Sequence, residues 1–251
     1  MKFSWLASAL LAGSLFAAPA LAQSDAKKPL SPEQEKAVQG IIKQYILDNP
    51  EVIIEAVESL RKKQEAMKAE QAKQALDTQK AALYDDKDSP VGGNVNGDVT
   101  IVEFFDYQCP YCKRAHVSLT EAVAKDGKIK IIYKEFPILS EESRIAAVAA
   151  LAARNQGKYL PFHNALLSAR DKLTAESIFA IAKSAGLDVD KLRKDMQSPE
   201  IGRALERNMA LADALNIRGT PAFIVGREIV PGAIDVDTIR ELVKRAREKK
   251  G

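Results

Sequence analysis

The chain has 251 residues, and its 37 Lys and Arg side chains nearly balance its 34 Asp and Glu side chains, which gives a formal charge of +3 at pH 7. This balance argues against a nucleic acid as partner, because nucleic-acid-binding domains are usually strongly basic. The chain holds only two cysteines, so it is not one of the small exported proteins that several disulfides hold together.

The N-terminal segment has the pattern of a secretory signal peptide. Lys2 precedes an apolar run over residues 5–16, and small residues lead up to Ala22. Such a run is too short to span a bilayer as a helix. We therefore predict that residues 1–22 are a signal peptide cleaved after Ala22, and that the protein is exported to a bacterial periplasm.

Residues 23–84 are predicted to form a helical stalk ahead of the main domain. Ser31-Pro32 is a typical helix start, since Ser caps a helix N-terminus and Pro is tolerated at the first helical position. Asn49-Pro50 repeats this signal. We therefore expect one helix that ends near Asp48 and a second helix that runs to about Leu83.

The second helix carries residues at alternating spacings of four and three, which is the spacing of a coiled-coil seam. This seam is apolar in its first half and rich in glutamine in its second half: Ile53, Val57, Leu60, Gln64, Met67, Gln71 and Gln74. An isolated helix is only marginally stable in water, so the apolar half needs a partner surface. We predict a homo-oligomer, either a dimer or a trimer; the alternative is a single solvated helix.

The rest of the chain alternates between strand-like and helix-like patterns. Residues 85–98 contain a proline and three glycines and are predicted to be a linker. An apolar strand, a helix and a second strand follow in residues 99–139, which makes a βαβ unit. Residues 140–215 have helical spacing, and strand character returns in residues 216–251 before a closing helix. A helical insertion therefore interrupts an α/β domain.

Both cysteines lie in the segment Cys109-Pro110-Tyr111-Cys112, which joins the apolar strand to the helix. Cys109 should stand at the helix N-terminus, where the backbone N–H groups and the helix dipole favour a thiolate. The thiolate is the nucleophile of thiol-disulfide exchange, and Cys112 becomes the resolving thiol. The alternatives are a structural disulfide, which would close a very short loop, and a zinc site, which would need two further ligands. We predict a redox-active Cys109–Cys112 disulfide and no other cofactor.

Four other polar side chains are candidates for a role at this site. His116 follows Cys112 by four residues, and His163 lies in the helical insertion. The charged side chains of Lys134 and Arg218 are the other two candidates. Because most charged and polar side chains are solvated, we expect all four to lie at the surface without a role.

The Cys-x-x-Cys after a Phe-Phe strand, the helical insertion and the later Gly219-Thr220-Pro221 resemble the DsbA-like thioredoxin-fold proteins over about residues 94–249. The resemblance implies an α/β fold: a thioredoxin fold with an inserted helical domain, preceded here by an N-terminal helical oligomerisation stalk. It also implies that Pro221 is cis and that Thr220 and Pro221, with Pro110 and Tyr111, face the substrate. Glu103 matches the family's buried acid, which exchanges a proton with Cys112.

The chain departs from this family at the residues between the cysteines. DsbA oxidases typically carry Pro-His there, whereas this chain carries Pro110-Tyr111. Tyrosine brings no positive charge, so we expect a less stabilised thiolate and a less oxidising pair. Thr220 before the proline is similar to the isomerases of the family. Residues 45–53 resemble the oligomerising segment of ScsC-type proteins, which are associated with bacterial copper tolerance.

Together these features predict an exported thiol-disulfide oxidoreductase that acts mainly as a protein disulfide isomerase or reductase. Its substrates would be exported proteins with wrong or reduced disulfides, and a membrane thiol reductase would supply its electrons. The alternatives are a monomeric DsbA-like oxidase, a copper(I)-binding protein that uses the thiolates of Cys109 and Cys112, and a scaffold in which the stalk matters most. No firm metal site is predicted, because no Met or His cluster accompanies the cysteines in the sequence.

Overall fold

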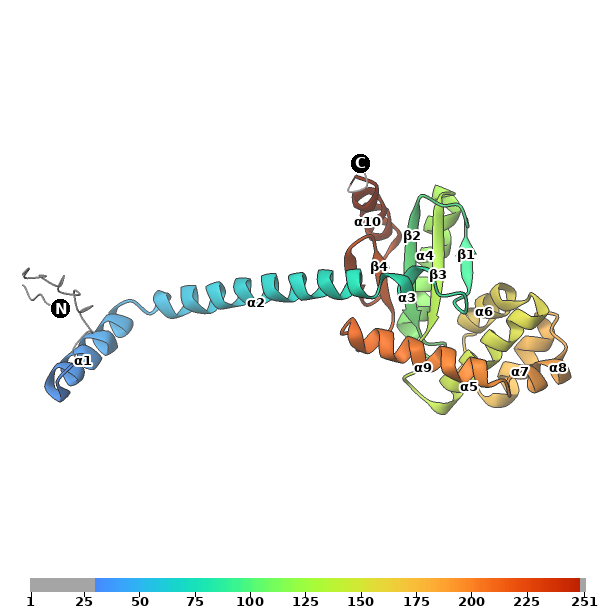
Figure 1. The fold of residues 1–251 in the computed structure, drawn as a ribbon, viewed down its shortest axis with the longest axis horizontal. Helices are drawn as coiled ribbons and strands as arrows, with labels where there is room; N and C mark the ends of the chain where they lie inside the picture. The colour runs from blue at the N-terminus through green and yellow to red at the C-terminus, as the bar shows by residue number, and fades with distance from the viewer. Residues whose placement is uncertain (1–29, 249–251) are drawn as a thin grey trace, which may run out of the picture. The chain divides into compact units, whose positions relative to one another are not determined.

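The structure is a computed structural model that describes residues 30–248. The predicted signal peptide therefore lies outside the described residues. The chain divides into two compact units, Met1–Arg61 and Lys62–Gly251, and Figure 1 shows the order of their elements. The boundary falls within a helix of the expected stalk, before the stalk's expected end at residue 84. Among residues 30–248, no helix combines the length and the apolar character that a membrane span requires.

The first unit consists of α1 (Pro32–Asp48) and the beginning of α2 (Glu51–Thr78). Ser31 caps α1, because its hydroxyl accepts from the Gln34 N–H while the Gln34 side chain accepts from the Ser31 N–H. The helix break predicted near residue 48 is confirmed. No residue of α1 is buried. Most of the large apolar side chains of the first unit are exposed: Leu30, Val38, Ile41, Ile42, Tyr45, Leu47, Ile53, Ile54, Val57 and Leu60.

The second unit is built on a sheet of five strands. These are β1 (Val91–Gly93), β2 (Val99–Phe105), β3 (Ile129–Glu135), β4 (Ala222–Val225) and β5 (Glu228–Pro231), in the spatial order β1-β3-β2-β4-β5. Strands β2 and β3 are parallel, and the other pairs are antiparallel. Strand β1 lies inside the segment predicted to be a linker, so that prediction missed one edge of the sheet.

Helix α4 (Pro110–Asp126) connects β2 to β3 and completes the predicted βαβ unit. It ends at Gly127, whose φ of 69° is the left-handed conformation that favours glycine at a helix C-terminus. Helices α4 and α10 (Val236–Glu248) supply buried side chains to the core on one face of the sheet. The C-terminal end of α2, α3 (Lys80–Tyr84) and α9 (Pro199–Ala214) cover the other face.

The predicted helical insertion is confirmed between β3 and β4. It contains α5 (Glu141–Ala152), the 3-10 helix η1 (Ala153–Gln156), α6 (Tyr159–Ser168), α7 (Ala175–Ser184), α8 (Val189–Asp195) and α9. The start of α9 follows the predicted signal, with Ser198 as N-cap and Pro199 in the first turn. The insertion shares its core with the α4 face of the sheet, so it borders the segment that carries the cysteines.

Candidate active site

The cysteine pair stands where β2 gives way to α4. Cys109 is the N-cap residue of α4, with an extended backbone (φ −75°, ψ 117°), and Pro110 occupies the first turn. Both cysteines are buried and both thiols are free, so the structure is that of the reduced protein. Pro110 and Tyr111, by contrast, are exposed. The helix start therefore presents its first two residues to a partner and keeps Cys112 in the core.

The two thiols have opposite acidities. The hydrogen bond from the Cys112 thiol, helped by the backbone N–H groups of Tyr111 and Cys112, lowers the pKa of Cys109 to about 5. Burial raises the pKa of Cys112 far above its usual range, and the hydrogen bond to Cys109 adds to this effect. At neutral pH the pair therefore consists of one thiolate and one thiol. This is the arrangement that an attacking and a resolving cysteine require.

The loop before β4 closes the site from the opposite side. The peptide bond between Thr220 and Pro221 is cis, as the resemblance implied. Strand β4 runs antiparallel to β2, with Ala222 opposite Phe104, and this register carries the loop to the cysteines. The Thr220 carbonyl oxygen lies 3.3 Å from the Cys109 Sγ and accepts a hydrogen bond from the thiol form. Residues 111 positions apart in the chain thus meet at the reactive sulfur.

Glu103 lies in the core beneath the pair. It is fully buried on β2, between Tyr133 of β3 and Phe223 of β4. Within the described part of the chain, neither carboxyl oxygen has a hydrogen-bond partner. Burial raises the pKa of Glu103 to about 8, and its charge contributes to the raised pKa of Cys112. A carboxyl group that titrates near neutrality beside a thiol can accept that thiol's proton.

Sequence reasoning missed two residues that hold the active-site turn. The buried Asp106 carboxylate accepts from the Gln108 N–H (2.8 Å), from the backbone N–H groups of Ile138 and Leu139 (2.9 and 3.0 Å) and from the Ser143 hydroxyl (2.7 Å). The Gln108 side chain exchanges two hydrogen bonds with the backbone of Leu173. The sequence holds a signal for both residues, because Asp106 and Gln108 are polar and lie between the apolar strand and Cys109.

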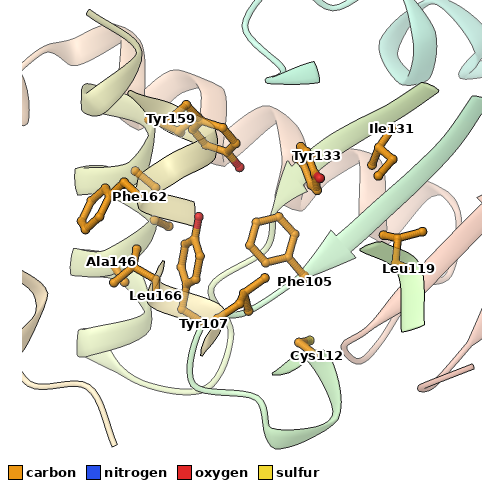
Figure 2. Packing of buried hydrophobic residues seen from close by; sticks show 14 of the residues in the cluster. Phe105, Tyr107, Cys112, Leu119, Ile131, Tyr133, Ala146, Tyr159, Phe162 and Leu166 are labelled. Atoms are coloured by element: carbon orange, nitrogen blue, oxygen red, sulfur yellow. The ribbon is translucent and has the colours of Figure 1, made fainter. Parts of the chain in front are cut away.

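A second buried polar cluster joins the sheet to the insertion. The hydroxyls of Tyr107 and Tyr159 both donate to Oε1 of Glu135, at 2.9 and 2.8 Å, and Figure 2 shows the two tyrosines with their hydroxyl oxygens turned toward each other. The Tyr107 hydroxyl also lies 3.0 Å from Nδ1 of His163. A tyrosine has only one proton to donate, so His163 donates to Tyr107 through Nδ1.

Three of the four side chains expected at the surface are buried instead. His163 is fully buried, and burial lowers its pKa well below the usual range, so it is neutral. His116 is 8% exposed, and its ring centroid is 5.5 Å from that of His163. Lys134 is fully buried and reaches Asp86 at 3.0 Å. The predictions for His163 and Lys134 were wrong because Tyr107, and Asp86 with Ser89, replace the lost water contacts from distant elements. Arg218 is exposed as predicted and pairs with Asp213.

An exposed aromatic side chain, Tyr111, lies beside the cysteine pair. The Arg114 guanidinium lies 4.5 Å above the ring of the exposed Tyr111, which fixes an aromatic surface beside Cys109. Among residues 30–248, no group of three or more His, Cys, Asp or Glu side chains is arranged to hold a metal ion.

Comparison with known proteins places the chain in a family. The description "DSBA-like thioredoxin domain" matches residues 100–244, which is more than half of the chain. The chain belongs to the DSBA-like thioredoxin family. A second description, "Copper resistance protein ScsC N-terminal domain", matches residues 34–66. The predicted fold class and the predicted resemblance to ScsC-type members of the DSBA-like family are both confirmed.

Some solved structures resemble most of the chain, and others resemble about two thirds of it. A thioredoxin-like oxidoreductase from Silicibacter pomeroyi is 45% identical, with a TM-score of 0.66, and covers 67% of this chain and 97% of its own. ScsC from Proteus mirabilis, in a transitional conformation, is 32% identical, with a TM-score of 0.65, and covers 88% and 98%. A periplasmic thioredoxin-like protein from Salmonella enterica serovar Typhimurium is 32% identical, with a TM-score of 0.60, and covers 66% and 94%.

Some curated relatives are much longer than this chain. A Na(+)/H(+) antiporter NhaA from Salinispora tropica is 27% identical over 158 residues, which are 62% of this chain and 24% of the antiporter. The chain thus spans about a quarter of the length of the first curated relatives that it matches.

Proposed function

We propose that this protein is a periplasmic thiol-disulfide oxidoreductase that acts mainly as a protein disulfide isomerase or reductase. One observation carries the proposal: a cysteine whose pKa is about 5 stands at the N-terminus of α4, 3.3 Å from the carbonyl before a cis-proline. The DSBA-like family and the similarity to a periplasmic thioredoxin-like protein support the proposed chemistry and location. No bound cofactor is needed.

The first step is attack by the Cys109 thiolate on one sulfur of a client disulfide. A bond forms between the Cys109 Sγ and that sulfur, the client S–S bond breaks, and the other client sulfur leaves as a thiolate with the electron pair. In isomerisation, another client thiolate attacks the client sulfur held by Cys109, and Cys109 is released with no net oxidation. The buried Cys112 stays protonated throughout this cycle.

In reduction, Cys112 completes the reaction. Its thiol loses a proton to the ionised form of Glu103, which a pKa of about 8 keeps in exchange with the protonated form near neutrality. The new thiolate attacks the Cys109 Sγ, the Cys109–Cys112 disulfide forms, and the client sulfur leaves as a thiolate. The client gains two electrons and the protein loses two. A membrane thiol reductase would return those electrons.

The Pro110-Tyr111 dipeptide favours this assignment over a strong oxidase. A low thiol pKa stabilises the reduced protein and makes the disulfide more oxidising. Tyr111 adds no positive charge beside the Cys109 thiolate. The pair should therefore be less oxidising than in oxidases that carry Pro-His between the cysteines.

The test is reactivation of a multi-disulfide protein whose disulfides have been scrambled, in a glutathione buffer. The wild-type protein should restore the substrate's activity, and Cys109→Ser should abolish reactivation because it lacks the attacking thiolate. A protein that oxidises a reduced substrate quickly but leaves the scrambled one inactive is an oxidase, and the isomerase proposal then fails.

Copper(I) binding is a second candidate, which the match of residues 34–66 to the ScsC N-terminal domain favours. Two thiolates suit Cu(I), a soft ion. Titration of the reduced protein with Cu(I), against a Cys109→Ser, Cys112→Ser double variant, tests this candidate. Equal uptake by the two proteins removes it.

A further inference from the structure

A groove of about 980 Å³ opens beside the loop that carries the cis-proline. One wall is the segment of residues 214–222, which includes Thr220 and Pro221. The residues of β5 and the turn after it, Ile229, Pro231 and Gly232, line a second side. The remaining wall is the C-terminal part of α2. The stalk helix is therefore part of a concave surface next to the reactive cysteine.

The residues that α2 contributes to the groove lie on a single face of the helix. Lys68, Gln71, Ala72 and Ala75 follow one another at spacings of three, one and three, which places them on the same side. The next residue, Leu76, is buried in the core formed with α3 and α9, and Asp77 pairs with Arg227. This part of α2 is thus anchored to the second unit, and the wall is fixed.

The groove and the site of exchange share Thr220. Thr220 lines the groove, and its carbonyl oxygen lies 3.3 Å from the Cys109 Sγ. A client joined to Cys109 by a mixed disulfide therefore places the chain beside its reacting cysteine at the mouth of this groove. Because an extended chain advances about 3.3–3.6 Å per residue, the groove would be reached within a few residues.

The lining indicates what such a chain should carry. Most of the lining side chains are apolar, and the small side chains of Ala72 and Ala75 leave room along the α2 wall. Lys68 and Arg218 are the charged residues of the lining, and both are cations. Arg218 pairs with Asp213, but both side chains are more than 60% exposed, so that pair competes only weakly with a ligand.

We propose that this groove binds an extended client segment that carries apolar residues and an acidic residue next to the reacting cysteine, and that the end of the stalk helix is part of the client-binding surface. The inference rests on the proposed function, because the client must first reach Cys109. Under this inference the protein prefers clients with such a sequence beside the cysteine. The stalk helix then binds clients in addition to holding copies of the chain together.

The inference also limits the predicted coiled-coil seam. Gln71 belongs both to that seam and to the groove wall. A partner helix packed on Gln71 would cover the wall, so the seam must end before this residue for a client to enter. Gln71 then faces clients rather than another stalk.

The test uses two quenched fluorescent peptides that contain a disulfide, with identical apolar flanks and either an acidic or a basic residue beside the cysteine. Lys68→Glu should raise the KM of the full-length protein for the acidic peptide about fivefold and lower the KM for the basic peptide, because one charge contact is worth up to about 1 kcal/mol. Lys63→Glu, on the opposite face of α2, is the matched control and should change neither KM. Equal KM values for the two variants would overturn the inference.

Two tryptophan substitutions test the α2 wall of the groove by adding bulk without changing charge. Ala72→Trp fills the groove and should raise the KM for both peptides, whereas Ala66→Trp, on the opposite face, should not. Exchange of glutathione disulfide by the wild-type protein separates the two hypotheses. If the wild-type protein does not exchange, the proposed function fails; if it exchanges but all KM values agree, the groove inference alone fails. Sedimentation confirms that each variant keeps the wild-type assembly.

Discussion

At the scale of single residues, the site depends on burying ionisable groups that remain available for reaction. Glu103 is buried without a hydrogen-bond partner among the described residues, and its pKa rises to about 8. A hydrogen-bonded or solvated carboxylate would be ionised throughout the neutral range and could not take up a proton there. Burial makes the ionised carboxylate unstable, so this carboxylate takes up a proton readily near neutral pH.

This burial should appear in the pH dependence of stability. The folded pKa of Glu103 is about 8, and the unfolded value is about 4.3. Below the unfolded pKa, Glu103 is protonated in both states and its ionisation does not affect stability. As the pH rises toward 8, Glu103 ionises in the unfolded protein but stays protonated in the folded one, so the free energy of unfolding falls. This fall is the ionisation penalty of Glu103. Glu103→Gln removes the penalty, so it should stabilise the oxidised protein by on the order of 3 kcal/mol at about pH 7. The gain should shrink toward about pH 4. Urea unfolding at both pH values measures it.

An exposed carboxyl provides a control of opposite sign. The hydrogen bond from Lys125 lowers the pKa of Glu121, so its favourable contribution is present at neutral pH and is lost in acid. Glu121→Gln should therefore not stabilise the protein at any pH. A wild-type protein whose stability, relative to Glu103→Gln, does not change between the two pH values would show that Glu103 is not held protonated.

The residues that sequence reasoning placed correctly differ in kind from those that it missed. Cys109 and Cys112 were found because their spacing and their position after a strand are local features. His163 and Lys134 were placed wrongly because their burial depends on Tyr107, Glu135 and Asp86, which come from other elements. A single sequence shows which residues are polar but not which partners the fold will bring to them.

At the scale of elements, the sequence predicted helices and their ends better than it predicted edge strands. The break between α1 and α2 lies at Asn49-Pro50, as the local pattern predicts, and Asn49 is the C-cap of α1. Strand β1 is only three residues long and contains two glycines. It exists because its backbone pairs with β3, which is a contact that no local pattern records.

The docking of α3 gives a prediction at this scale. Leu83 is fully buried in the core that α2, α3 and α9 form over the sheet. Leu83→Ala should lower the free energy of unfolding by about 2–5 kcal/mol, because it leaves a cavity in a packed core. Leu139→Ala is the matched control, since Leu139 is 52% exposed and should change stability by about 0.5 kcal/mol or less. Equal losses in urea unfolding would mean that α3 does not belong to this core.

At the scale of the whole molecule, the exposed apolar residues of the first unit require an explanation. Ile41 and Ile54 are 69% and 61% exposed, and isolated surface leucines or isoleucines are common, but a cluster of this size usually marks an interface. The same region matches the ScsC N-terminal domain. We therefore expect the first unit to hold several copies of the chain together, and the second unit to carry the chemistry.

Association would matter for isomerisation more than for simple exchange. A scrambled client has several wrong disulfides, and several thiolates held on one assembly act at a high local concentration. A chain that begins at Lys62 removes the first unit but keeps Leu76, Leu83 and the α2 wall of the groove. It should sediment as a monomer, exchange glutathione disulfide at the wild-type rate per cysteine pair, and reactivate the scrambled protein several-fold more slowly.

The place of the cut decides what this experiment measures. A chain that begins after Leu83 would also lose two core side chains, Leu76 and Leu83, so its inactivity could reflect unfolding. The cut at Lys62 follows the boundary between the two units and avoids that ambiguity. If the shorter chain is monomeric and still reactivates the scrambled protein at the full rate, association serves something other than isomerisation. If it remains an oligomer, the interface lies in the second unit.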